Sequence, residues 1–263
     1  MLGKLLKYDL KWNLKFLSIF YILTLFFAIL TRIFINIENS FFMDIVGKIC
    51  TGATISLIFN IIVNNTFRLW ANFRQKVYGD ESYLTHTLPV KKSSIYFSKM
   101  LAAVISLFIS FLVIIFALFV AYYSKDGFES LRVILNPIFN SIKLSFTGAL
   151  AILILVLFLE LLNMLQCGFT GVIIGHRFNN AKIGFSVLFG FITYMISQAI
   201  ILVLLFIPAI FNSNFMNLFF TTDTVSPEII KFVIILSTIS YLLLVILGFF
   251  INKKLFNKGV NVD

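Results

Sequence analysis

Residues 100–124 read MLAAVISLFISFLVIIFALFVAYYS, a run without a charged side chain. A helix that crosses the apolar part of a bilayer needs about 20 such residues, so this run predicts a transmembrane helix. The whole chain has the same character, because 60% of its 263 residues are hydrophobic and only 12% are charged. Soluble domains hold about 25% charged residues. A soluble chain of this composition would expose large apolar patches, so the sequence predicts an all-α, polytopic membrane protein.

Five further stretches have the length and apolarity of a membrane span. The six predicted spans lie within one transmembrane domain, residues 1–263, and cover residues 16–35, 44–65, 96–123, 144–167, 184–208 and 228–251. Pro208 ends the fifth span. Ser226 can cap the sixth, whose first position suits Pro227. The apolar segment 209–227 is compatible with a re-entrant or surface helix.

The basic side chains indicate how the spans are oriented. The net charge is +10, from 21 Lys and Arg against 11 Asp and Glu. When the N-terminus is placed in the cytoplasm, 15 of the 21 basic residues fall in cytoplasmic segments and the other 6 fall outside. Cytoplasmic loops of membrane proteins carry such an excess. The charge therefore predicts a multi-pass protein of the cell membrane with cytoplasmic N- and C-termini, and no nucleic-acid partner.

Residues 1–15 are predicted to form an amphipathic helix in the membrane interface. At about 100° per residue, lysines fall on one stripe, opposite leucines and a tryptophan; the polar and aromatic residues of this helix are Lys4, Lys7, Asp9, Lys11, Trp12 and Lys15. The alternative is that the lysines serve only to orient the chain. Asp9 lies within the apolar face, so its carboxylate needs a partner, either a basic residue of a cytoplasmic loop or another subunit.

The loop after the second span contains the segment GDESYLTHTLPV, residues 79–90. Asp80 can cap a short helix that Pro89 would end. Leu84 and Leu88 share a face that Tyr83 flanks. We expect a docking element on the cytoplasmic side, whereas the alternative is a loop helix resting on lipid. The residues expected to form this element are Asp80, Glu81, Tyr83, Leu84, His86, Leu88 and Pro89.

This segment resembles the cytoplasmic loop of six-span permeases in ABC exporters, the type-2 exporter family of low-GC bacteria. The matching residues are Gly79, Asp80, Glu81, Tyr83, Leu84, Thr87, Leu88, Pro89, Ser98 and Lys99, the last two at the entry to the third span. The opening residues 6–11, the turn 175–179 and the basic tail 252–254 are similar too.

The resemblance implies that the chain is the permease subunit of an ATP-driven exporter. In that family the loop carries a coupling helix, which inserts into a groove of a separate ATPase subunit. Two permeases and two ATPases form the exporter, and the fifth span contributes to the contact between permeases. The implied partners are an ABC ATPase, which binds ATP and Mg, and a second copy or a homologous permease, within membrane lipid. No cofactor is expected on this chain.

An enzymatic function is not predicted. Convergent ionisable groups at one depth are needed for catalysis, and the predicted spans hold one central carboxylate and no histidine. Gly47 and Gly52 have the spacing of a phosphate-binding loop, but the next residues are Ala53 and Thr54, so the lysine that the motif requires is absent. We therefore expect no catalytic residue, no metal ligand and no ATP hydrolysis by this chain.

Glu160 is the only charged residue of the fourth span. Ionised at a helix centre, it would cost about 2.5–3.5 kcal/mol, so we expect it to be paired, protonated or facing water. Asn163 and Gln166 continue a polar stripe from it. The favoured interpretation is a hydrogen-bonded contact between helices. The alternative is a proton-coupled secondary transporter that uses Glu160.

Small residues on the fifth span predict close helix packing, with cargo contact as the alternative; they are Ser186, Gly190, Thr193 and Ser197. Gly171 and Gly175, which follow the fourth span, have a similar spacing. The spans are rich in Phe, Leu and Ile and hold few charges, which favours an amphipathic cargo. A peptide antibiotic or toxin is the expected class.

Overall fold

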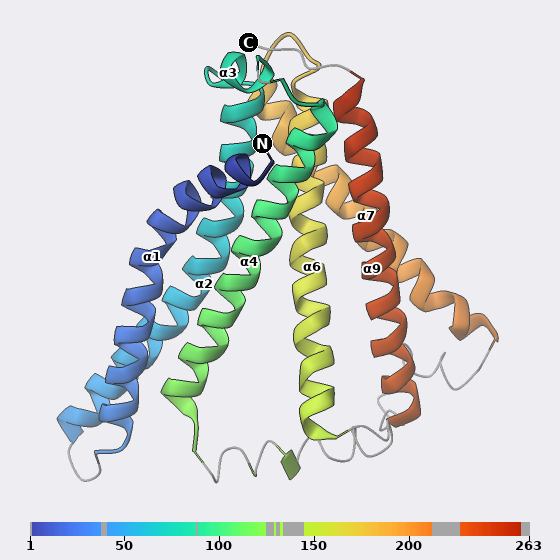
Figure 1. Ribbon diagram of the computed structural model, residues 1–263. Helices are drawn as coiled ribbons and strands as arrows, with labels where there is room; N and C mark the ends of the chain where they lie inside the picture. The colour runs from blue at the N-terminus through green and yellow to red at the C-terminus, as the bar shows by residue number, and fades with distance from the viewer. Residues whose placement is uncertain are drawn as a thin grey trace. The chain divides into compact units, whose positions relative to one another are not determined.

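The protein is described here from a computed structural model that covers residues 2–37, 41–87, 89–124, 129, 132–133, 145–211 and 227–258. Within these ranges the chain is helical and contains no strand, which confirms the predicted all-α class. The helices are α1 (Leu2–Ile35), α2 (Phe41–Val77), α3 (Ser82–His86), α4 (Lys92–Tyr122), α6 (Phe146–Gly175), α7 (Lys182–Phe211) and α9 (Pro227–Asn257) (Figure 1).

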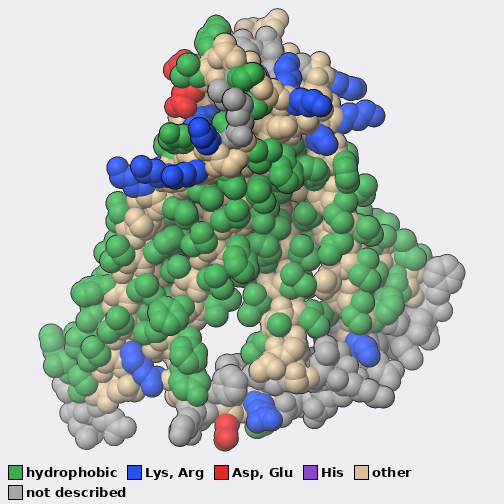
Figure 2. All heavy atoms as spheres, viewed as in Figure 1, with side chains coloured by type: hydrophobic (Ala, Val, Ile, Leu, Met, Phe, Trp, Pro, Cys, Tyr) green, Lys and Arg blue, Asp and Glu red, His purple; other side chains and the backbone are tan. Residues whose placement is uncertain are grey.

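Six of these helices are long and apolar enough to cross a membrane, as predicted. Their outward surfaces carry large hydrophobic side chains; for example, Ile22 is 67% exposed and Phe59 is 68% exposed. Figure 2 shows hydrophobic side chains along the middle of the helices, with Lys and Arg toward their ends. Only a lipid solvent makes such a surface favourable, so the chain is a multi-pass membrane protein.

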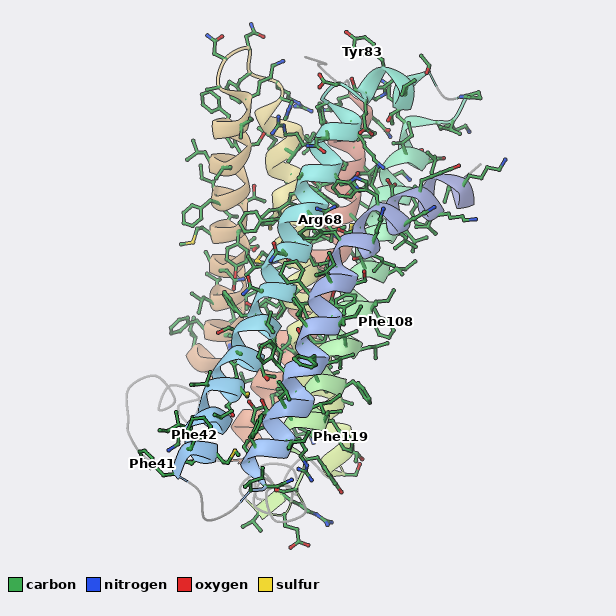
Figure 3. The ribbon with its side chains drawn as sticks, turned by 90° about the vertical axis from the view of Figure 1, so that its left-hand side faces the viewer. Phe41, Phe42, Arg68, Tyr83, Phe108 and Phe119 are labelled. Atoms are coloured by element: carbon green, nitrogen blue, oxygen red, sulfur yellow. The ribbon has the colours of Figure 1, made fainter. Side chains whose placement is uncertain are left out.

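The first two long helices extend beyond the spans drawn from the sequence. Residues 1–15 and 16–35 were expected as an interfacial helix and a span, but α1 runs without a break over both. No glycine or proline lies between residues 4 and 35 to end it. For the same reason α2 continues past residue 65 to Val77, where Gly79 follows. Figure 3 shows the N-terminal part of α1 bending away from the axis of the rest of the helix.

The helices divide into two compact units, one with α1, α2, α3 and α4 and one with α6, α7 and α9. In each unit the first long helix packs against both others: α1 against α2 and α4, and α6 against α7 and α9. Their association into the single transmembrane domain expected for residues 1–263 stays a prediction. The apolar segment 209–227 lies almost wholly outside the described residues.

The α6–α9 unit packs two helix backbones directly against each other. A Cβ atom added to Gly171 of α6 would overlap the Ser186 carbonyl oxygen and the Gly190 backbone of α7. One added to Gly175 would overlap Ser186. Glycine is therefore required at both positions for this approach. The packing predicted for the small face of the fifth span is confirmed for Ser186, Gly190 and Ser197, the last of which bonds Asn163 of α6.

Candidate functional site

The short helix α3 is held against the end of α2. The Ser82 N–H donates to the Gly79 carbonyl at 2.8 Å, and Nε2 of His86 lies 3.0 Å from the Val77 carbonyl oxygen. The helix begins after Glu81, whose side chain makes no capping hydrogen bond. The prediction that Asp80 caps the helix was wrong, because the turn from Gly79 delays the first helical residue to Ser82.

Two large apolar side chains stand on the surface of α3. Tyr83 is 67% exposed and Leu84 is 74% exposed, and Figure 3 shows Tyr83 at one end of the molecule, beyond α2. Asp80 and Glu81 are exposed beside them. Leu88, the third apolar residue expected here, lies outside the described residues, and Pro89 follows beyond the helix end as expected. Charged groups thus border a small exposed apolar surface.

A cavity of about 590 Å³ lies beneath α3 within the α1–α4 unit. Its wall combines the N-terminal part of α1, the end of α2, the α3 segment and the first turns of α4. The lining residues are Lys4, Leu5, Tyr8, Asp9, Lys76, Glu81, Leu84, Thr85, Val90, Ile95, Ser98 and Lys99. Residues of the sequence-predicted loop and of the predicted interfacial helix therefore share one site. Ser98 and Lys99, singled out by the family resemblance, belong to it as well.

Asp9 joins three helices at this cavity. Its Oδ1 atom lies 2.6 Å from the Lys99 Nζ of α4 and 3.0 Å from the Lys76 Nζ of α2. The side chains of Asp9, Lys99 and Lys76 are only 4%, 7% and 18% exposed. The sequence predicted that Asp9 pairs either with a basic residue of a cytoplasmic loop or with another subunit, and the structure shows two basic partners within the chain. Mutual pairing offsets the cost of desolvating these charges, so the cluster fixes α1 to both neighbouring helices beside α3.

The lysine stripe of α1 takes no part in the Asp9 ion pairs, although Lys4 lines the cavity. Lys4, Lys7, Lys11 and Lys15 are all exposed, as the helical periodicity predicted. On another side of the same helix, Trp12 receives the Arg68 guanidinium of α2, which lies 4.0 Å from the ring centroid. Such contacts contribute about 0.5–1 kcal/mol at exposed sites. The face opposite the lysines therefore packs against protein, and not against lipid alone.

A network of amides and hydroxyls continues along the same helices. Asn13 Nδ2 donates to Asn65 Oδ1 at 2.8 Å and to Ser106 Oγ at 2.6 Å. Asn65 Nδ2 donates to Ser110 Oγ at 2.7 Å, and Tyr21 shares a 2.7 Å hydrogen bond with the same hydroxyl. The sequence analysis missed this network. Asn13 follows Asp9 by four residues and Ser110 follows Ser106 by four, a helical spacing that could have indicated it.

The intramembrane polar residues of the α6–α9 unit connect its helices. Asn163 Nδ2 donates to Ser197 Oγ of α7 at 2.9 Å. Asn252 of α9 donates to the Gln166 carbonyl at 3.1 Å and accepts from Thr170 at 2.7 Å. The expected hydrogen-bonded contact between helices is thereby confirmed for Asn163, while Gln166 contributes its backbone oxygen.

Glu160 lies near two tyrosines of neighbouring helices. It is half-buried and interacts electrostatically with Tyr194 of α7 and Tyr241 of α9. The Tyr241 hydroxyl also donates to Gln198 at 3.4 Å. The carboxylate is therefore in a polar setting within the unit.

No protein-family model, curated protein or solved structure matches the chain. Function is therefore inferred from three features of the structure: α3, the Asp9 cluster and the adjoining cavity.

Proposed function

We propose that this multi-pass membrane protein is the permease subunit of an ABC exporter of the type-2 family, in a bacterial cell membrane with both termini cytoplasmic. The single observation that carries the proposal is α3, which exposes Tyr83 and Leu84 beyond the end of a membrane-spanning helix. An apolar anchor bordered by charged groups is the usual anatomy of a small protein interface. α3 is therefore the proposed docking element for a separate ATPase subunit.

The contacts of α3 with the long helices are suited to transmitting a movement of α3 to them. His86 bonds to the end of α2, and Glu81, Leu84 and Thr85 share a cavity wall with residues of α1 and α4. The Asp9 cluster connects these three long helices beside that cavity. A displacement of α3 by an ATPase would therefore act on three spans together, because they are tied within one packed unit.

The remaining parts of the proposal concern the complete exporter. The ATPase subunit binds ATP and Mg, and a second permease, either a copy of this chain or a homologous one, completes the transport path. The cargo is an amphipathic molecule, with a peptide antibiotic or toxin as the favoured class, because a path lined by such apolar spans suits lipid-like surfaces better than hydrated ions.

Affinity purification from the native membrane tests this function. A tagged chain solubilised in mild detergent should retain an ABC ATPase, identified by mass spectrometry. The complex should hydrolyse ATP faster when an amphipathic peptide is added. Purification of the chain without any ATPase, together with transport driven by a proton gradient in liposomes, would contradict the proposal.

The second candidate is a proton-coupled transporter that uses Glu160. It is favoured by the position of this half-buried carboxylate near Tyr194 and Tyr241, whose hydroxyls could exchange protons with it. The two candidates differ in where energy enters the molecule: at α3 in the exporter and at Glu160 in the proton-coupled transporter.

A further inference from the structure

The cavity beneath α3 has a surplus of positive charge. Lys4, Lys76 and Lys99 line it, together with the carboxylates of Asp9 and Glu81, so the lining carries three positive and two negative charges. Both Lys76 and Lys99 bond to the same oxygen of Asp9. A single carboxylate neutralises only one of these two poorly exposed ammonium groups. Glu81 is exposed to solvent, where its charge is better screened. The cavity is therefore suited to a further anion.

One buried hydroxyl of the cavity wall is not used by the fold. Ser98 is 1% exposed, and its Oγ atom has no hydrogen-bond partner among the described residues. Buried polar groups are normally hydrogen-bonded, and an exception calls for an explanation. Ser98 and Lys99 both line the cavity, so its wall contains a hydroxyl donor and an ammonium donor. Phosphate oxygens accept hydrogen bonds from both kinds of group.

The rest of the wall is apolar and lies at the ends of membrane spans. Leu5, Leu84, Val90 and Ile95 line the cavity next to the lysines. Ile95 and Lys99 lie in the first turns of α4, directly before the uncharged run 100–124, so this side of the cavity is expected at the depth of the lipid headgroups. Its volume of about 590 Å³ is in the range of small-molecule sites. A free phosphate would use the lysines but not the apolar wall.

We propose that this cavity binds one anionic phospholipid of the surrounding bilayer. The phosphate lies against Lys4, Lys99 and the Ser98 hydroxyl, and the glycerol and upper acyl region packs along Leu5, Val90 and Ile95. The lipid thereby contacts α1, the linker before α4 at Val90, and α4 at once. This binding depends on the chain being a membrane protein and not on an ATPase partner, so the proposed function and this inference can fail separately.

Native mass spectrometry of the purified chain in detergent tests the site, with phosphatidylglycerol as the probe. We expect one tightly held phosphatidylglycerol per chain and weaker retention of phosphatidylcholine. Lys4→Gln should weaken phosphatidylglycerol binding by about fivefold, the effect of one lysine near an anionic lipid. Ser98→Ala should also weaken it, while circular dichroism shows the helices intact.

Lys7→Gln is the matched control. Lys7 is an exposed lysine of the same helix, three residues from Lys4, and does not line the cavity. This variant should change binding by less than about twofold. Equal weakening by Lys4→Gln and Lys7→Gln would show diffuse attraction to the lysine stripe and overturn the proposal. Equal retention of phosphatidylcholine would also overturn it.

A soluble headgroup distinguishes a lipid from a free phosphate. Glycerol phosphate carries the anionic group without acyl chains, so it should not displace phosphatidylglycerol at equal concentration. If it competes as strongly as the lipid, the apolar wall contributes nothing and the lipid assignment is wrong.

Discussion

The α1–α4 unit and the α6–α9 unit are built on the same plan but held by different chemistry. Each has a first long helix that packs against two others. In the α1–α4 unit the helices are joined by the Asp9 ion cluster and by the amide network of Asn13 and Asn65. In the α6–α9 unit they are joined by the glycine contacts of Gly171 and Gly175 and by neutral hydrogen bonds.

The two kinds of contact differ in how much helix movement they allow. Ion pairs and amide hydrogen bonds are made by the ends of side chains. Such groups can change partners when the helices shift. Backbone contacts at glycine leave no such freedom, because interiors are close-packed. The α6–α9 unit therefore has fixed backbone contacts in addition to its hydrogen bonds, whereas the ion pairs and amides described for the unit that carries α3 are adjustable, as expected if an ATPase moves it. The following changes separate the two kinds of contact, beginning with the largest expected effect.

Removing the Asp9 carboxylate should strongly destabilise the α1–α4 unit. Asp9→Ala leaves the buried Lys99 and the partly buried Lys76 without their counterion, which should lower the free energy of unfolding by about 3–5 kcal/mol. Denaturant titration in detergent, followed by circular dichroism, measures this. The control is Asp44→Ala, which breaks the exposed 2.7 Å pair with Lys48 and should cost less than about 1 kcal/mol. Equal losses in both variants would show that the Asp9 cluster is not structurally important.

Adding one methyl group should disturb the α6–α9 unit. In Gly171→Ala the new Cβ overlaps backbone atoms of α7, so the helices must separate at an expected cost of about 1–3 kcal/mol. Thermal unfolding in detergent measures the change. Gly184→Ala is the control, since nothing lies within 4 Å of a Cβ there; it should be neutral or stabilising because alanine favours helix. A harmless Gly171→Ala would contradict the close packing of α6 and α7.

Replacing Glu160 by glutamine should have the smallest effect. Glutamine keeps a hydrogen-bonding group near Tyr194 and Tyr241 but cannot carry a charge. We expect the free energy of unfolding to change by less than about 1 kcal/mol and transport in proteoliposomes to persist. Normal folding with loss of transport would instead favour the proton-coupled transporter.

The sequence predicts much of this fold because its strongest patterns are local. The uncharged run 100–124, the basic stripe of α1 and the small face of α7 follow from hydropathy and helical spacing alone. Helix ends were less predictable, because a span ends where the bilayer ends, whereas α2 continues until Gly79 interrupts it. Membrane thickness and helix length are separate quantities.

Contacts between residues that are distant in the sequence could not be predicted from it. The need of Asp9 for a basic partner could be predicted from its place on an apolar face, but the choice of Lys76 and Lys99 depends on the rotation and register of three helices. The same holds for Asn13, Asn65 and Ser106. The loop motif included Ser98 and Lys99 without indicating that they share a cavity with Leu5 and Leu84.

The central claim is that α3 docks an ATPase, and a double substitution on α3 tests it most directly. Tyr83→Ala with Leu84→Ala removes the exposed apolar anchor, since the two side chains are 67% and 74% exposed. Loss of a dominant aromatic anchor costs at least about 2 kcal/mol, or roughly thirtyfold in affinity. Leu118→Ala with Tyr122→Ala removes the same residue types from the far end of α4, where they are 42% and 38% exposed.

The measurement is the amount of ATPase that copurifies with each tagged variant from the native membrane. We expect the Tyr83 and Leu84 variant to insert normally but to lose the ATPase, while the Leu118 and Tyr122 variant retains it. Undiminished ATPase on the Tyr83 and Leu84 variant, with normal transport, would show that α3 is not the docking element.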